Sequence, residues 1–359
     1  MMKKRIVGID VARALAIIGM IIVNFKIAVG SIGMDSLQSI VGLLDGKAAA
    51  TFVVLAGIGV AFMSNSSVQN NDAPKLRKVQ ISLFKRAIFL FVIGLLYIPI
   101  WPADILHFYG IYMLLTLALL TSGKRTILVA GIILIFAYPF MMFIWDYDIG
   151  WNFDTLEYPS FWSVEGFFRN LFYNGFHPVI PWAAFMLIGL WFGKNDLRDA
   201  KFIKKSAVVS LGFFILTILF SQFLLTILSE GDINARNELE QILGTSPMPP
   251  LPIYMISGSS FAIFTISICV IISEKFEKSK VISALKDTGQ LALTFYVAHV
   301  IIGMGLIEFI DPAKMGKYST GFSVLYAIGF SLSCILFAVI WKKYKTIGPL
   351  EWVMRKLTA

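Results

Sequence analysis

An aspartate and a histidine three residues apart form the pair in this chain that is best suited to acid–base chemistry. They are Asp104 and His107, in the stretch WPADILHFYG. Residues three apart on a helix share a face, so the carboxylate can contact the imidazole. A carboxylate beside a histidine fixes its tautomer and raises its basicity, which suits a general base near neutral pH. We therefore predict that Asp104 and His107 act together in catalysis.

Two more histidines and an asparagine also lie in apolar surroundings. His177 directly precedes Pro178, His299 follows Tyr296 at one turn's spacing, and Asn24 lies deep in a long apolar run. Polar residues are costly in such segments and usually face the bundle interior or a water-filled path. Each of the three is a candidate for catalysis, and the alternative is a hydrogen bond between helices or, for His177, a helix cap. The sequence leaves both alternatives open.

These residues lie on apolar segments that are long enough to cross a membrane. The chain has 359 residues, of which 57% are hydrophobic and 15% charged, and its mean hydropathy is +0.78. In soluble proteins about a quarter of residues are charged. A spanning helix needs about 20 apolar residues, and in lipid the backbone must satisfy its own hydrogen bonds. We predict an all-α polytopic membrane helix bundle, with about ten spans in one domain over residues 1–359. The predicted spans are 8–30, 47–65, 82–101, 103–122, 126–145, 177–194, 206–228, 251–273, 288–310 and 320–341.

Lysine and arginine collect in every second gap between the predicted spans. Short loops rich in these residues stay in the cytoplasm. We therefore predict a multi-pass protein of the plasma membrane with both termini cytoplasmic. The net charge of +9 follows from this bias, and we predict no nucleic-acid partner. The basic gaps contain Lys3, Lys4 and Arg5; Lys75, Arg77 and Lys78; Lys124 and Arg125; Lys194, Arg198, Lys201, Lys204 and Lys205; Lys275, Lys278, Lys280 and Lys286; and, in the tail, Lys342, Lys343, Lys345, Arg355 and Lys356.

The remaining polar and small residues suggest packing and anchoring. Asp10 and Arg13 share a helix face and can form an ion pair, although a guanidinium also binds phosphate bidentately. Close helix packing, with a homodimer as the alternative, is predicted by Gly189 with Gly193 and by the run of small residues Ala48, Ala49, Ala50, Ala56, Gly57 and Gly59. The aromatic gap 146–176 is either an anchor at the outer interface or a lid over an outward-facing cavity.

No metal site or disulfide is expected. The two cysteines, Cys269 and Cys334, each lie inside a predicted span, so they offer neither a disulfide framework nor a cluster of ligands. The three histidines lack the spacing to cysteine or carboxylate that metal sites show. We interpret both cysteines as packing residues.

Several motifs together resemble a known family. The stretches RIVGIDVARALAIIGMIIVNF, DGKAAATFVVLAGIG, DILHFYGIYMLL, HPVIPWAAFMLIGLWFGK, TGQLALTFYVAH and GPLEWVMRKLT resemble the bacterial YeiB-like membrane proteins. That group is similar in turn to the heparan-alpha-glucosaminide N-acetyltransferases. The resemblance implies a transmembrane O- or N-acyltransferase, which moves an acetyl or other acyl group from cytoplasmic acyl-CoA to an extracytoplasmic sugar or cell-wall acceptor.

The resemblance also implies roles for single residues. Asn24 matches a position that works alongside the family's catalytic histidine, which lies in the loop before the second helix. Here that loop, SIGMDSLQSIVGLLDG at 31–46, has no histidine. Either another histidine has taken over, or the chemistry differs, or the fold persists without acyl transfer. The polyanionic donor is expected to bind basic residues near helix ends, namely Arg13, Lys85, Arg86, Lys124 and Arg125, and a path should lead from them to the histidines.

Two other functions compete with acyl transfer. A transporter of a lipid-linked or small organic molecule would be marked by inverted repeats and by helices that break at the membrane midplane. The chain has no evident repeat, and Pro99 and Pro139 lie toward the outer ends of their spans. A non-catalytic assembly or sensor protein is the third possibility, favoured if no cavity links the basic residues to the histidines.

Overall fold

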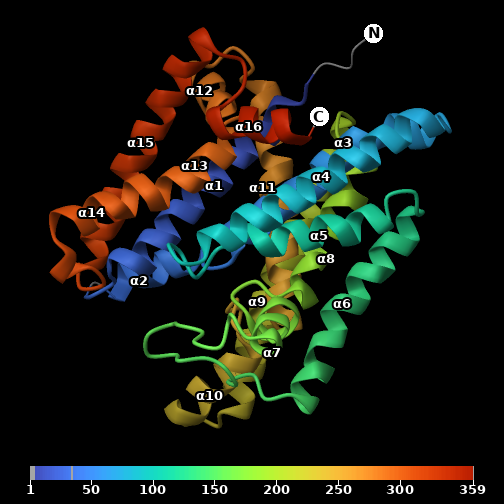
Figure 1. The fold of residues 1–359 in the computed structure, drawn as a ribbon. Helices are drawn as coiled ribbons and strands as arrows, with labels where there is room; N and C mark the ends of the chain where they lie inside the picture. Colours follow the sequence, from blue (N-terminus) through green and yellow to red (C-terminus); the bar gives the residue numbers. More distant parts are fainter. Residues whose placement is uncertain (1–4, 34, 359) are drawn as a thin grey trace. The chain divides into compact units, whose positions relative to one another are not determined.

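Helices make up the structure, a computed structural model that describes residues 5–33 and 35–358 (Figure 1). Lys3 and Lys4, on which the predicted orientation of the N-terminus partly depends, lie outside these residues. Within them no β-strand forms, and only three isolated β-bridges occur. The predicted all-α fold is confirmed.

Eight helical segments of the described chain are long and apolar enough to cross a membrane. A bent pair of helices, Val164–Asn174 and Val179–Gly193, would form a ninth span, and its two halves meet at 47°. The chain is therefore a multi-pass membrane protein, whereas the predicted total of ten stays a prediction. The eight segments are Val7–Val29 (α1), Ser36–Gln69 (with α3, Lys47–Gln69), Ala73–Tyr97 (α4), Lys124–Ile144 (α6), Ala200–Leu228 (α9), Pro252–Lys275 (α11), Ala292–Ile310 (α13, η2 and α14) and Thr320–Tyr344 (α15).

Three predicted spans differ clearly from the helices observed. The span predicted at 82–101 is α4, which begins nine residues earlier, at Ala73, and ends at Tyr97. The expectation that Lys85 and Arg86 lie near a helix end is therefore wrong. The span predicted at 103–122 is the 13-residue helix α5 (Leu106–Ala118), because the chain turns through residues 98–104 before it becomes helical. The span predicted at 177–194 is α8 (Val179–Gly193), which is preceded by α7 (Val164–Arg169) and the π-helix η1 (Asn170–Asn174). Pro178 directly precedes α8, where its fixed φ suits the start of a helix. Hydropathy alone does not reveal such breaks.

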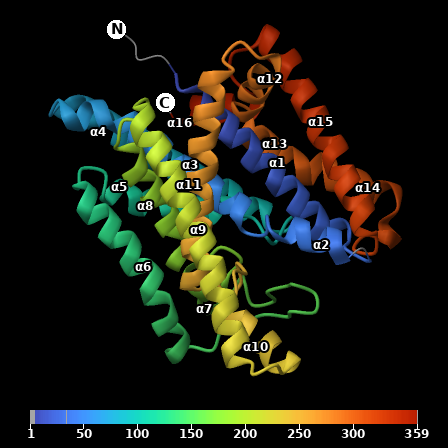
Figure 2. The same cartoon turned by 180° about the vertical axis from the view of Figure 1, so that it is seen from behind.

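The described residues form two compact units. The first unit combines the chain up to Leu55 with Leu197–Val208 and Ala262–Leu357. In it α1 packs against α12 (Lys280–Gly289), α13 (Ala292–Ala298) and α15, as Figure 2 also shows. The second unit contains Ala56–Asp196 and Val209–Phe261, and there α5 packs against α4 and α8, while α6 packs against α8. The single domain predicted for the chain stays a prediction.

Small residues let α3 and α8 approach closely in the second unit. A Cβ atom on Gly57 would lie 2.0 Å from the carbonyl oxygen of Met186, and one on Gly193 would lie 2.7 Å from the Cβ of Ala61. Gly59 has nothing within 4 Å of its Cβ position. The predicted close packing is confirmed at Gly57 and is wrong at Gly59, and Gly193 packs within the chain.

This contrast predicts opposite effects of one substitution. Gly57→Ala should lower the free energy of unfolding by about 1–3 kcal/mol, because the methyl group must displace backbone. Gly59→Ala should raise it by roughly 0.5–1 kcal/mol, since the space is open and alanine favours the helix. Thermal melts of the two purified variants in detergent test the pair. Equal melting temperatures would show that α3 and α8 are not in close contact at Gly57.

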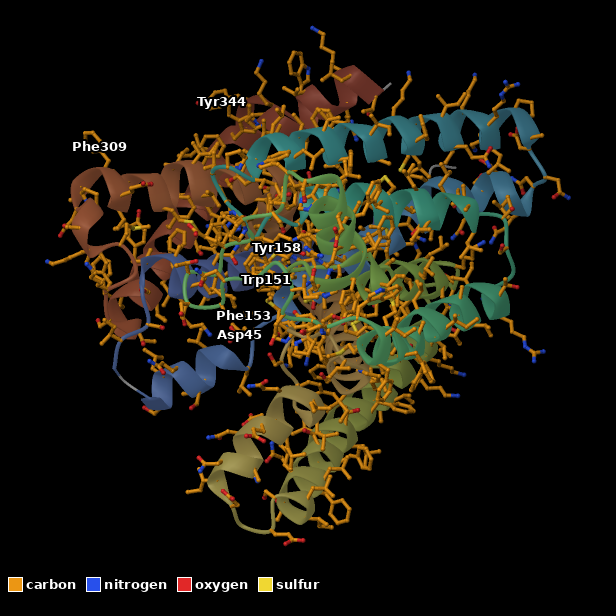
Figure 3. All side chains as sticks on the ribbon, turned by 60° about the horizontal axis from the view of Figure 1, so that its bottom comes forward. Asp45, Trp151, Phe153, Tyr158, Phe309 and Tyr344 are labelled. Carbon is orange, nitrogen blue, oxygen red and sulfur yellow. The ribbon has the colours of Figure 1, made fainter. Side chains whose placement is uncertain are left out.

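The aromatic segment 146–176 is folded by contacts among its own residues (Figure 3). The Trp151 and Phe153 rings stack with centroids 5.6 Å apart, and the Tyr158 ring meets Trp151 edge-on at 5.2 Å. The Trp151 indole donates to the carbonyl oxygen of Asn174 at 2.6 Å, and the Tyr158 hydroxyl bonds the Asn174 side chain at 3.0 Å. The segment is thus an ordered aromatic loop, and both its predicted roles, anchor and lid, stay open.

Candidate active site

Asp104 and His107 form a buried dyad where α5 begins. One Asp104 oxygen, Oδ2, lies 3.0 Å from His107 Nδ1 and also accepts from the His107 backbone amide at 3.2 Å. The side chains are 0% and 1% exposed. The predicted contact is confirmed. Because an ionised carboxylate only accepts hydrogen bonds, Nδ1 carries the proton and Nε2 keeps a lone pair.

That Nε2 atom of His107 is buried and, among the described residues, has no hydrogen-bond partner. A buried polar atom without a partner costs about 1–3 kcal/mol, and such atoms often mark a site for water or a ligand. The neighbouring helix comes close, since a Cβ on Gly94 of α4 would lie 2.2 Å from the His107 amide nitrogen. The dyad is therefore rigidly held, with a free lone pair on its far nitrogen.

The Phe108 ring lies close to both His107 of this dyad and His177. The Phe108 ring centroid is 3.9 Å from His107 and 6.0 Å from His177. The Tyr112 hydroxyl donates to the His177 carbonyl oxygen, and the Trp182 ring meets His177 edge-on at 4.6 Å. In the described part of the chain, His177 Nδ1 and Trp182 Nε1 are also buried without a partner. The second unit thus gathers two of the predicted histidines around one aromatic ring.

Asn24 and His299 meet in the first unit, although 275 residues separate them. The Asn24 side-chain amide, Nδ2, is 2.9 Å from His299 Nε2, and His299 Nδ1 bonds the carbonyl oxygen of Tyr296. A carbonyl only accepts, so Nδ1 is the donor and Nε2 accepts from Asn24. His299 is 0% exposed and opens the π-helix η2 (His299–Met304). Both of its nitrogens are occupied, as in a hydrogen bond between membrane helices.

Asp10 lies at the centre of a polar network at the start of α1. It accepts from Arg13 Nη1 at 2.8 Å, from Arg5 Nη2 at 2.8 Å and from Gln290 at 3.3 Å. Lys342 donates in turn to Gln290 Oε1 at 2.8 Å. The predicted pairing of Asp10 with Arg13 is confirmed. The hydrogen bond to Asp10 raises the pKa of Arg5, and the network ties α1, α12 and α15 together.

Comparison with known proteins identifies the family of this chain. A family model described as heparan-alpha-glucosaminide N-acetyltransferase, catalytic, matches residues 5–227. The chain belongs to this family. A second model, described as a protein of unknown function (DUF418), matches residues 191–359 of this acetyltransferase-family chain. Together the two matches confirm the resemblance inferred from the motifs.

One curated protein resembles this acetyltransferase-family chain along nearly its whole length. It is described as an uncharacterized 39.9 kDa protein in the amylase 3′ region of Bacillus acidopullulyticus, and it is 21% identical over 373 residues. The match covers 99% of the present chain and 94% of the other protein. No solved structure matches the chain.

The basic residues predicted to bind the donor are divided between the two units of this family member. Arg13 lies in the first unit, whereas Lys85, Arg86, Lys124 and Arg125 lie in the second. Lys124 donates to the Asn195 side chain at 2.7 Å, and Lys85 and Arg125 are exposed. The predicted path from Arg13 and Arg86 to the histidines therefore stays a prediction.

The residues that could hold a metal are scattered. Among residues 5–33 and 35–358, no group of three or more His, Cys, Asp or Glu side chains could hold a metal ion. Cys269 and Cys334 are free and buried. Each is therefore a packing residue in its helix.

Sequence reasoning missed the aromatic and backbone partners of His107 and His177. Phe108, Tyr112, Trp182 and Gly94 surround the two histidines of the second unit. A signal existed for Trp182, which follows His177 in an otherwise apolar stretch, but spacing does not predict the contact of Gly94 with another helix. Phe108 and Trp182 contact the imidazole rings, whereas Tyr112 and Gly94 contact the backbone of the two histidines.

Proposed function

We propose that this chain is a membrane acyltransferase that moves an acetyl or other acyl group from cytoplasmic acyl-CoA to a hydroxyl or amine of an extracytoplasmic sugar or cell-wall acceptor. The acetyltransferase family supports the reaction type. The observation that carries the proposal for this chain is the buried Asp104–His107 dyad with its unpartnered Nε2. A buried base with a free lone pair is what transfer to a hydroxyl or amine requires.

In the proposed reaction His107 first accepts a proton from the acceptor and then donates it to the leaving group. Nε2 takes the proton of the acceptor hydroxyl or amine as the acceptor atom bonds to the thioester carbonyl carbon. The carbon–sulfur bond of the tetrahedral intermediate then breaks, and the imidazolium returns the proton to the sulfur of coenzyme A. Asp104 stays ionised and holds Nδ1–H, so it stabilises the imidazolium and keeps Nε2 toward the substrates. Positioning of the two substrates supplies much of the remaining rate enhancement.

The donor is a polyanion, and its phosphates need cations at the cytoplasmic face. We assign this role to Arg13 in the first half of α1, to Lys85 and Arg86 in the middle of α4, and to Lys124 and Arg125 at the start of α6. Arg13 is 25% exposed, and one of its guanidinium nitrogens, Nη1, donates to Asp10. Its other guanidinium donors can bind a phosphate. We place the protein in the plasma membrane, with the dyad on the outer side of the positive-inside arrangement.

His299 is the other candidate base, because its partner Asn24 matches a family position beside the catalytic histidine. His107 is preferred since its Nε2 is unpartnered, whereas both nitrogens of His299 are occupied. His299→Gln should lower the free energy of unfolding by about 0.5–2 kcal/mol. It should keep acyl transfer within about tenfold of the wild-type rate, well inside the loss expected for a missing base.

The rate of acyl transfer is measured with the purified His299→Gln chain in nanodiscs, as the transfer of radiolabel from acetyl-CoA to an amino sugar. Asn24→Ala is the matched variant, because it removes the same hydrogen bond from the other side and should have the same effects. If either variant loses transfer completely while still binding coenzyme A, the base is His299 and not His107.

A further inference from the structure

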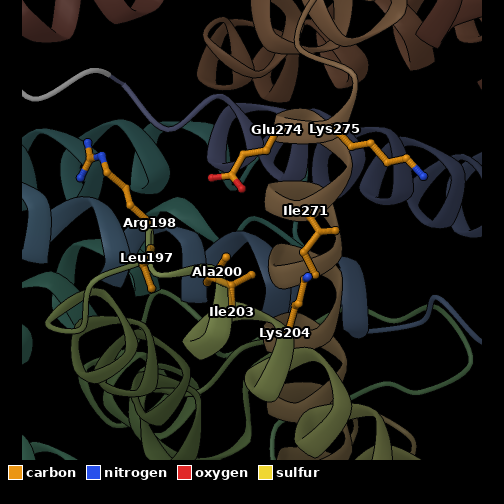
Figure 4. A pocket seen from close by; sticks show the side chains of 8 residues that line it. All are labelled: Leu197, Arg198, Ala200, Ile203, Lys204, Ile271, Glu274 and Lys275. Atoms are coloured by element: carbon orange, nitrogen blue, oxygen red, sulfur yellow. The ribbon is translucent and has the colours of Figure 1, made fainter.

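A cavity of about 400 Å³ lies between the start of α9 and the end of α11 in the first unit (Figure 4). Its lining combines aliphatic side chains with charged ones. Figure 4 shows Lys204 extending from α9 toward Ile271 of α11, and Glu274 pointing toward the side on which Arg198 lies. The lining residues are Leu197, Arg198, Ala200, Ile203, Lys204, Ile271, Glu274 and Lys275.

The cavity lining has more basic than acidic side chains, and two of the basic ones form no ion pair with a described residue. Three of its charged residues are basic and only Glu274 is acidic. Among the described residues, neither Lys204 nor Lys275 forms an ion pair, and both side chains are exposed. Lys275 instead lies over the ring of Phe276, 5.4 Å from its centroid. The cavity therefore suits an anion from outside the chain.

The aliphatic part of the lining and its surroundings indicate which kind of anion. Leu197, Ile203 and Ile271 give the cavity an apolar wall. The same two helices continue with exposed apolar side chains, among them Val208 (72% exposed) and Ile272 (42% exposed). A phosphate held by the basic residues would thus have a hydrocarbon surface beside it. A soluble phosphate gains nothing from contact with an apolar surface, whereas the acyl chains of a lipid pack against it.

The side of the membrane agrees with this chemistry. Residues 194–205 and 275–286 are two of the lysine-rich gaps that are predicted to face the cytoplasm, where anionic lipids give the leaflet a negative surface potential. Basic pockets between membrane helices on this side typically bind phospholipid headgroups. We infer that the cavity binds the phosphate of an anionic phospholipid headgroup, with Arg198 and Lys204 as its ligands and the acyl chains along α9 and α11.

Lipid retention by the full chain tests the inference, and its outcome does not depend on acyl transfer. The chain is purified from phosphatidylcholine nanodiscs doped with phosphatidylglycerol, and native mass spectrometry counts the phosphatidylglycerol that it keeps. Each basic residue contributes about 1 kcal/mol, so removing one should weaken binding about fivefold. Arg198→Gln with Lys204→Gln should therefore weaken it by roughly 25-fold. Lys205→Gln, a neighbour outside the cavity lining, is the matched control and should retain the lipid.

Three results would overturn the inference. The double variant could keep as much phosphatidylglycerol as the wild type. Lys205→Gln could lose as much as the double variant, which would mean that only the net charge of the loop matters. Finally, inorganic phosphate or coenzyme A at millimolar concentration could displace the bound lipid from the wild type. The cavity would then be a site for a soluble phosphate instead of a lipid.

Discussion

Replacing His107 with glutamine should lower the rate of acyl transfer by about 10²- to 10⁴-fold, the usual contribution of a general base. Glutamine has nearly the reach of histidine, but its amide nitrogen has no basic lone pair and cannot accept a proton from the acceptor. The substitution leaves the donor-binding residues unchanged, so kcat should fall while the affinity for coenzyme A stays the same. Transfer of radiolabel from acetyl-CoA and equilibrium binding of coenzyme A, both with purified chain in nanodiscs, measure the two quantities.

His177→Gln is the matched control for His107→Gln. His177 lies near the same Phe108 ring but has no carboxylate partner in the described chain. Replacing His177 should therefore lower the rate of acyl transfer less than replacing His107 does. An equal loss in the two variants, with both still folded and binding coenzyme A, would show that the pair acts together or that the site is simply disturbed.

Asp104→Asn should lower kcat by a similar order, about 10²- to 10⁴-fold, although the residue touches no substrate. Asparagine can still accept the hydrogen bond from the His107 backbone amide, so the start of α5 should be preserved. The amide no longer favours the tautomer with the proton on Nδ1, and it does not stabilise the imidazolium. Thermal melts together with kcat and KM for acetyl-CoA separate this positioning role from a loss of folding.

Asp311→Asn provides the control for charge alone. Asp311 pairs with Lys314 at 3.5 Å in the first unit and the lysine is 65% exposed, so the contribution of this pair to stability is small. This variant should transfer acyl groups at nearly the wild-type rate. If Asp104→Asn also kept the wild-type kcat, the carboxylate would have only a structural function and the dyad would not be the base.

The local part of the site could be predicted from the sequence, whereas the long-range part could not. Asp104 and His107 are three residues apart, and helix geometry alone predicts their contact. Asn24 and His299 are 275 residues apart, and no periodicity links them, because their contact depends on how α1 packs against η2. The cavity between α9 and α11 likewise depends on the packing of two helices that are distant in the sequence, although its basic residues are visible there as topology signals.

The fold followed from hydropathy for most of the continuous helices, although α4 begins nine residues before the span predicted at 82–101. Helices such as α1, α9 and α15 were predicted to within a few residues, except at the start of α9, because each is one unbroken apolar run bounded by polar residues. Hydropathy failed at α5 and around α8, where the chain breaks within an apolar region. Averaging over about 20 residues hides a turn of a few residues, so the short helix and the bent pair needed the structure.

Acyl transfer by the purified wild-type chain is the measurement that tests the central claim most directly. The chain in nanodiscs is given radiolabelled acetyl-CoA and an amino sugar, beside His107→Gln at equal concentration. We expect label on the sugar with the wild type, about 10²- to 10⁴-fold less with the variant, and equal binding of coenzyme A by both. Equal transfer by the two proteins, or no binding of coenzyme A by the wild type at millimolar concentration, would contradict the proposed function.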